Sequence, residues 1–311
     1  MQRQLTFGGW VSPRNTRLRG QSIIEYVLII AVIGLVIMFA GPGVAGAIRN
    51  QFNQVTNTVD SGTDGDNFMS AEEKAYREAM KTVAQKDAKD WTLDEQKAAA
   101  TDIAKNGTSS SVYAKAEAAM NAGTKFSTKL TNGKTLEYRI VGINHDDLSD
   151  GSGKAGLTFE VTNTALGAQK MNARNTNVGG WEKSELRGRL NSGDLWALLP
   201  TELQSKVKPV TKMTDNKGAI RGTPSATTDK IFLLSMTEVY GDMLSDGTQY
   251  EFYKSKGVTT SNYFGASLEV FHWSRSASPY SSGNFRPVSN NGNWSDDPAN
   301  VNAGVLPAFC F

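Results

Sequence analysis

The chain has 311 residues and nearly balanced charge, with 33 Lys and Arg residues against 31 Asp and Glu residues and a formal net charge of +2. This balance argues against a polyanion such as nucleic acid as the partner. Hydrophobic residues make up 39% of the chain, which is enough to bury a sizeable core. The single cysteine, Cys310, excludes an internal disulfide, and two histidines, His145 and His272, leave little material for histidine-based metal chemistry. These counts weaken the case for an enzyme.

The amino terminus has the pattern of a membrane-spanning segment. The first 20 residues contain basic side chains and no acidic one, and the stretch from Val27 to Ala40 is continuously apolar. Such a run is long enough to cross a bilayer as a helix, and the basic residues before it predict a cytoplasmic amino terminus and an exported body. An ordinary secretory signal, cut near Ala45–Ala47, is the alternative.

The string GQSIIEY, which contains Gly20, Gln21, Glu25 and Tyr26, precedes this apolar stretch. It resembles the processing site of type IVb pilins of the Flp (tight-adherence) kind. The resemblance implies that a prepilin peptidase removes a leader, residues 1–20, and that the mature chain begins at Gln21 with a hydrophobic spine helix to about residue 59. A carboxylate inside an apolar segment is costly without a partner, so Glu25 would pair with the new amine of Gln21 or of a neighbouring subunit. A plain membrane anchor, with Glu25 among the lipid headgroups, is the alternative.

Residues 60–68 are polar and glycine-rich, which is typical of a linker. Capping-box spacings that begin at Ser70 and Thr92 each open a stretch rich in Ala, Lys and Glu. With a third short helix from about Val112 to Asn121, these features predict a helical spacer or a docking subdomain over residues 69–124.

Beyond Lys125 the pattern changes to that of an α+β domain. The predicted elements are strands over 126–130 and 136–143 around a TNGK turn, helices over 181–190 and 201–205, and a strand over 230–235.

Separated motifs in this part resemble a widespread family of extracellular and phage-associated bacterial domains with no assigned activity, which is similar to the C-type lectin fold. The motifs are Tyr138–His145, Asp150–Gly156, Gly179–Arg187, Asp229–Ser235, Trp273–Ser276 and Gly304–Phe311. The resemblance covers about residues 125–311. It implies a C-type-lectin-like domain. Taken with the preceding segments, the predicted fold class is α+β, in which a pilin-like transmembrane helix and the helical spacer precede the C-type-lectin-like domain. Trp273 and Phe309 are expected in its core.

The last 42 residues, from Val270 to Phe311, contain no Lys, Glu, Gln, Met, Thr or Ile. This composition resembles the variable region of proteins that a retroelement diversifies by mutating adenines, here over about residues 270–304. Tyr, Ser, Asn and Gly also compose adaptable binding surfaces, although an irregular polar loop region is the alternative. We expect the ligand contacts to include His272, Arg275, Ser278, Tyr280, Ser281, Ser282, Asn284, Arg286, Ser289, Asn291, Asn293, Asp296, Asp297, Asn300 and Asn302.

The sequence predicts no metal site and no cofactor. His145, Asp146 and Asp147, with Asp150, could surround Ca²⁺, but their spacing fits no EF-hand loop and a tight turn accounts for them. Asn293–Asp296 is the string nearest to the calcium motifs of sugar-binding C-type lectins, and it departs from them.

The predicted function is that of a minor or tip subunit of a type IVb pilus, an adhesin that displays a ligand-binding domain at the cell surface. Its partners would be other pilin subunits, the prepilin peptidase, the cytoplasmic membrane before assembly, and a ligand on a host, bacterial or phage surface. The alternative is a membrane-anchored receptor-binding protein outside any pilus. An enzyme is not expected, since Ser235 near Glu238 and His272 near Ser274 belong to no nucleophile elbow or triad order.

Overall fold

The computed structural model describes residues 69–217, 223–241, 243–268 and 270–311. All of them belong to one structural unit. The predicted leader, spine helix and linker lie outside the described residues.

The predicted fold class needs one correction. The described part of the chain is α+β, as expected, but none of its helices is both long and apolar enough to cross a membrane. The span predicted from Val27 to Ala40 falls outside the described residues. The prediction of a pilin-like transmembrane helix was therefore wrong as a description of this structure, and we do not carry it further.

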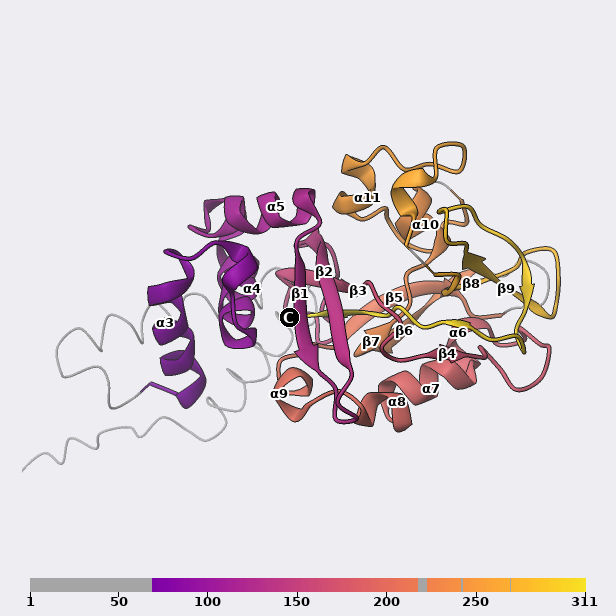
Figure 1. Ribbon diagram of the computed structural model, residues 1–311, viewed down its shortest axis with the longest axis horizontal. Coiled ribbons are helices and arrows are strands. Elements are labelled where there is room, and N and C mark those ends of the chain that lie inside the picture. Colours follow the sequence, from indigo (N-terminus) through magenta and orange to yellow (C-terminus); the bar gives the residue numbers. More distant parts are fainter. Residues whose placement is uncertain (1–68, 218–222, 242, 269) are drawn as a thin grey trace, which may run out of the picture. The chain divides into compact units, whose positions relative to one another are not determined.

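Within the described residues, three α-helices precede the first strand (Figure 1). They are α3 (Ala71–Val83), α4 (Leu93–Asn106) and α5 (Tyr113–Ala122). Ser70 caps α3 by accepting the backbone N–H of Glu73, and Thr92 forms a complete capping box with Glu95 at α4. Gly123 ends α5 in the left-handed region, with φ of 66°. The three predicted helices are confirmed.

These helices share one hydrophobic core with the strands, although the sequence predicted a separate spacer. Ala100, Ile103 and Ala116 are fully buried in the same cluster as the sheet residues. A Cβ atom on Gly156, just before strand β3, would lie 1.8 Å from the carbonyl oxygen of Ala100. Only glycine allows α4 to approach the sheet so closely, so the helical region is part of the domain.

Two five-stranded sheets and a hairpin carry the rest of the fold. The first sheet has the order β1-β2-β3-β12-β7, the second β10-β9-β8-β11-β4, and β5 pairs with β6. Their bounds are β1 Lys125–Lys129, β2 Thr135–Ile143, β3 Leu157–Val161, β4 Ala168–Gln169, β5 Val210–Asp215, β6 Pro224–Asp229, β7 Ile231–Phe232, β8 His272–Ala277, β9 Asn284–Val288, β10 Asp297–Pro298, β11 Ala303–Gly304 and β12 Ala308–Cys310.

The first sheet is central because β3 and β12 are buried along their whole lengths. β12 lies between β3 and β7, so the carboxyl end of the chain closes the core. Trp273 and Phe309 are each 1% exposed, which confirms that both belong to the core.

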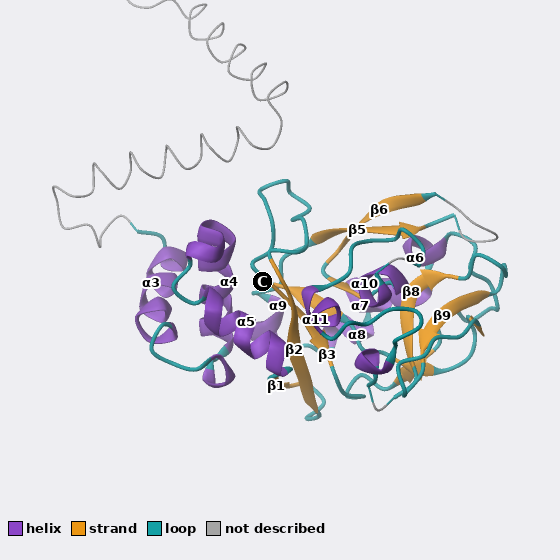
Figure 2. Cartoon of the chain, turned by 90° about the horizontal axis from the view of Figure 1, so that it is seen from above, coloured by secondary structure: helices purple, strands orange, loops and turns teal. Residues whose placement is uncertain are grey.

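The remaining helices are short. They are α6 (Gly180–Lys183), α7 (Glu185–Asn191), α8 (Asp194–Ala197), α9 (Thr201–Gln204), α10 (Met236–Tyr240) and α11 (Glu251–Ser255). In Figure 1, α10 and α11 are drawn above β5–β7 and α7–α9 below them. Figure 2 shows α3 and α4 on one side of β1 and β2, as Figure 1 does.

The helix predicted over 181–190 is broken into α6 and α7. Ser184 has an extended backbone there, and its hydroxyl accepts the N–H of Arg187 and donates to the carbonyl of Trp181. A serine that both ends one helix and caps the next competes with a continuous helix.

Candidate ligand-binding site

The region predicted to contact a ligand forms the edge of the second sheet. β8 and β9 are antiparallel neighbours joined by residues 278–283, and β10 pairs with β9. The register shifts between Trp273 and Ala277, which bends the hairpin near its tip.

Asn177 holds the loop at this tip. Its fully buried side chain donates from Nδ2 to the carbonyl oxygens of Ser281 and Asn284, at 2.7 and 2.8 Å. Its backbone N–H donates to the carbonyl of Ser282 at 2.8 Å. A loop fastened at these points can present its outward side chains in a fixed arrangement.

Several of the predicted contact residues shape the next loop instead. The hydroxyl of Ser289 donates to Oδ1 of Asn291, which also accepts the N–H of Asn293. Gly292 has φ of 86°, and a Cβ atom there would lie 2.1 Å from the carbonyl of Tyr263. These side chains are committed to local hydrogen bonds, as is usual for Asn and Ser in turns.

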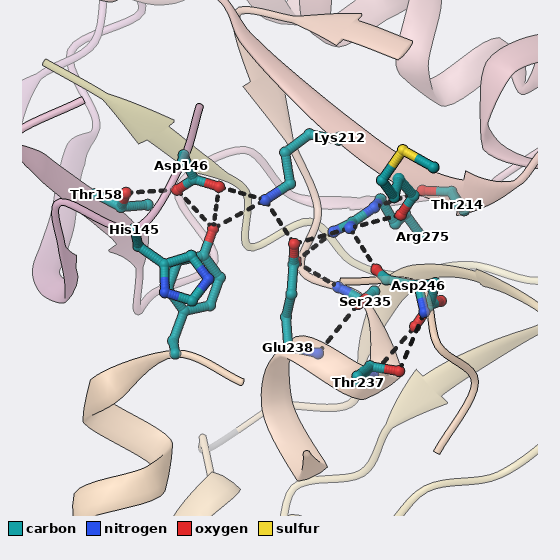
Figure 3. Close-up of polar contacts among 12 residues, drawn as sticks. His145, Asp146, Thr158, Lys212, Thr214, Ser235, Thr237, Glu238, Asp246 and Arg275 are labelled. Carbon is teal, nitrogen blue, oxygen red and sulfur yellow. Dashed lines mark hydrogen bonds and ion pairs between the residues drawn. The ribbon is translucent and has the colours of Figure 1, made fainter. Parts of the chain in front are cut away.

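Arg275 is fully buried and cannot reach a ligand in this structure. Its guanidinium forms a two-point ion pair with the carboxylate of Glu238 and donates to Oγ1 of Thr214 at 2.7 Å. It also donates to the backbone carbonyls of Leu233, Met213 and Asp246. Every nitrogen of the group has a protein acceptor, so Arg275 joins β8 to β5 and α10 (Figure 3).

The same carboxylate connects Arg275 to a second buried cation. Nζ of Lys212 lies 2.5 Å from Oε1 of Glu238 and 2.5 Å from Oδ1 of Asp146. Thr158 and Tyr250 also donate to Asp146, at 2.6 and 2.9 Å. We call Asp146, Lys212, Glu238 and Arg275 the buried charge network (Figure 3).

In this network the ion pairs shift the pKa values more strongly than burial does. Burial by itself would raise the pKa of Asp146 and Glu238, but Lys212 lowers the pKa of Asp146 below its usual range, and Arg275 and Lys212 do the same for Glu238. Burial would likewise lower the pKa of Lys212, and the charges of Asp146 and Glu238 raise it instead. All the members therefore stay charged at neutral pH.

An open pocket of about 460 Å³ lies beside this network, at the β8–β9 hairpin. We call it the hairpin pocket. It is lined by Asp215, Met243, Leu244, Ser245, Asp246, Ala277, Pro279, Tyr280, Arg286 and Trp294. Its volume lies in the range of sites that hold small ligands.

Arg286, on β9, supplies the main hydrogen-bond donor of the pocket. Its side chain is 3% exposed, and its guanidinium lies 4.6 Å from the ring centre of Trp294 and 5.5 Å from that of Tyr280. Nε donates to Oδ1 of Asp296 at 3.1 Å. The two terminal nitrogens make no hydrogen bond with any described residue.

Asp246 supplies a buried acceptor on the other wall. It is 2% exposed, and its carboxylate accepts the backbone N–H of Thr237 at 3.2 Å and the hydroxyl of Ser276. It forms no ion pair within the described part of the chain. The carboxylate therefore keeps capacity for further donors.

The structure brings only part of the predicted set together. Tyr280 and Arg286 line the hairpin pocket, and Asp296 pairs with Arg286. Four predicted residues are buried: His272, Arg275, Ser278 and Arg286. Away from the pocket lining, exposed or half-buried, are Ser281, Ser282, Asn284, Ser289, Asn291, Asn293, Asp297, Asn300 and Asn302.

Other pocket residues were missed. Asp215 ends β5, and Met243 to Asp246 form the loop after α10. Both segments look like ordinary turns in the sequence, and no spacing links them to the carboxyl-terminal stretch. Trp294 lies within the predicted variable region but was not among the expected ligand contacts, and its aromatic character was the one available signal.

The carboxylates of the turn considered for Ca²⁺ already have partners within the protein. Asp146 belongs to the buried charge network, and Oδ1 of Asp150 accepts the N–H of Ser152 at 2.9 Å. In the part of the chain that the structure describes, no cluster of three or more His, Cys, Asp or Glu residues could hold a metal ion.

Fold and pocket together define an α+β domain with a small aromatic-lined site at a sheet edge. The chain belongs to the family described as a domain of unknown function (DUF6273), whose model matches residues 155–311. No curated protein and no solved structure matches the chain. The resemblances to pilins, to the C-type lectin fold and to retroelement-diversified proteins stay predictions.

Proposed function

We propose that this protein is a recognition protein that binds a surface ligand in the hairpin pocket. The observation that carries the proposal is the position of Arg286. Its guanidinium is almost wholly buried and paired through Nε with Asp296, while its two terminal nitrogens have no acceptor among the described residues and belong to a group that lines the pocket, where a ligand can bond to them. The pocket also lies in the segment whose Tyr-, Ser- and Asn-rich composition suits ligand contact.

The test compares two exposed aromatic side chains. Tyr280 lines the pocket and is 67% exposed, whereas Phe264 is 70% exposed and outside the pocket lining. Binding of the full chain to a panel of bacterial and host cells would be measured for the Tyr280→Ala and Phe264→Ala variants. We expect Tyr280→Ala to weaken binding about tenfold or more, as for an aromatic anchor, and Phe264→Ala to leave it unchanged. Equal binding by both variants would contradict the proposal.

Diversification of the pocket is a second, independent test. If the region after Val270 is a variable binding surface, sequences of this locus from many cells should differ mainly within residues 270–304. Substitutions spread evenly over residues 125–311 would contradict this part of the proposal.

Display at the cell surface is proposed from the sequence alone. The string Gly20–Tyr26 favours removal of a leader and presentation as an adhesive pilus subunit. Protein recovered from sheared surface material should then begin at Gln21. A chain that still carries residues 1–20 in that fraction would contradict this route.

A further inference from the structure

We infer that the ligand of the hairpin pocket is a neutral saccharide, whose hydroxyl groups bond to both Arg286 and Asp246. This inference rests on the proposed function, because it names the chemical class that the same pocket would bind.

Arg286 offers hydrogen-bond donors to a ligand. The ring of Trp294 and the carboxylate of Asp296 fix the plane of its guanidinium, and only Nε is bonded to a described residue. A planar guanidinium offers five N–H donors in a rigid fork. The terminal nitrogens belong to a group that lines the pocket, so a bound molecule with an oxygen acceptor can take the place of water there.

Asp246 can accept a further hydrogen bond from the same ligand. Its two oxygens accept one backbone N–H and one hydroxyl, whereas an ionised carboxylate accommodates about four hydrogen bonds. A ligand group that only accepts hydrogen bonds would use the donors of Arg286 and leave the remaining acceptor capacity of Asp246 unused. A hydroxyl both donates and accepts, so one chemical group meets both needs.

The charges argue against an anion as the ligand. Asp296 already offsets the charge of Arg286, and the carboxylates of Asp215 and Asp246 both line the pocket. These carboxylates would repel an anion, and a cation would supply no acceptor to Arg286. A neutral ligand with hydroxyl groups avoids the repulsion and supplies that acceptor.

The aromatic rings favour a saccharide over other neutral ligands. Tyr280 presents a largely exposed ring at the pocket, on which the C–H face of a sugar ring can pack. A sugar carries hydroxyls on neighbouring carbon atoms, whereas a peptide backbone has a single donor and a single acceptor per residue. In a pocket of about 460 Å³, neighbouring hydroxyls of one sugar can bond to Arg286 and to Asp246 while the sugar ring packs on Tyr280.

The experiment is binding of the full chain to a printed array of neutral oligosaccharides, sialylated and sulfated oligosaccharides, and acidic and basic peptides. Tyr280→Ala removes the ring, Arg286→Lys keeps the charge but loses the fork, and Phe264→Ala is the matched control. Circular dichroism and thermal unfolding would verify that each variant is folded. We expect neutral oligosaccharides to bind, with EDTA having no effect.

Both pocket variants should weaken that binding about tenfold or more, and the control should not. Binding of acidic sugars or peptides alone, dependence on a divalent cation, or an array without any bound neutral saccharide would overturn the inference. Peptide binding that Tyr280→Ala abolishes would overturn the saccharide and keep the pocket function. Cell binding that neither pocket variant changes would overturn both.

Discussion

Two buried arginines on neighbouring strands differ in how many of their guanidinium nitrogens are bonded within the protein. Arg275 on β8 is fully buried, and each of its nitrogens has a protein acceptor. Arg286 on β9 is almost as buried, but only Nε is bonded within the described structure. The degree of burial hardly distinguishes them, whereas the completeness of their hydrogen bonds does. Arg275 is therefore fully engaged by the fold, whereas Arg286 keeps donors that a ligand in the pocket can use.

Breaking the buried charge network should have the largest effect. Glu238→Gln removes the charge that both Arg275 and Lys212 contact, while keeping the size of the side chain. We expect a loss of about 3–5 kcal/mol in the free energy of unfolding, because buried cations are left uncompensated. Urea denaturation measures it, with Glu182→Gln on α6 as the half-exposed control, for which we expect a change below about 0.5 kcal/mol. A loss below about 1 kcal/mol for Glu238→Gln would show that the network adds little to stability.

Lys97 extends the comparison to a half-buried cation that forms no ion pair with a carboxylate among the described residues. Burial and the nearby charge of Lys208 together lower its pKa to about 8. A lysine whose pKa is lower in the folded state destabilises the fold below that value, and the cost fades as the pH rises from about 8 toward 10.5. Lys97→Met should therefore stabilise the chain by about 1–3 kcal/mol at pH 7 and by much less at pH 10. Equal effects at the two pH values would show that the charge of Lys97 is not responsible.

Acid should weaken the buried charge network. The pKa values of Asp146 and Glu238 are lowered in the folded state, so their contribution is complete above their ordinary values of 3.8 and 4.5 and is lost as the pH falls below them. We expect the free energy of unfolding to fall steeply below about pH 4.5 and to change little between pH 5 and 7. Denaturation at a series of pH values measures this, and Glu238→Gln should flatten the slope. A slope that the variant leaves unchanged would assign the acid sensitivity to other groups.

Arg286→Lys should have the smallest effect on stability. The substitution loses one hydrogen bond to Asp296, so we expect a cost of about 1 kcal/mol together with the loss of binding. Arg275→Lys should cost several times as much, because it loses contacts with Thr214 and three backbone carbonyls. Equal losses of stability for the two variants would remove the distinction between the two arginines.

Local signals in the sequence predicted the elements that depend on local structure. The capping residues Ser70 and Thr92 and the terminal Gly123 gave the three helices before the first strand. The β1–β2 hairpin also follows its predicted turn. The sequence did not show that these helices share the core, because the contact between Gly156 and Ala100 joins residues far apart in the chain.

The candidate site was predicted only in part, for the same reason. The composition after Val270 indicated a binding region, and Tyr280 and Arg286 lie at the pocket. That pattern could not separate Arg275 from Arg286, since the partners of each arginine come from other segments. Asp246 comes from the loop after α10, which no local spacing connects to the hairpin.

A crystal structure of the full chain with the saccharide that binds most strongly on the array tests the central claim most directly. Our account predicts the sugar in the hairpin pocket, with hydroxyl oxygens about 3 Å from a terminal nitrogen of Arg286 and from a carboxylate oxygen of Asp246. A sugar bound elsewhere, with the terminal nitrogens of Arg286 still without an acceptor, would contradict it.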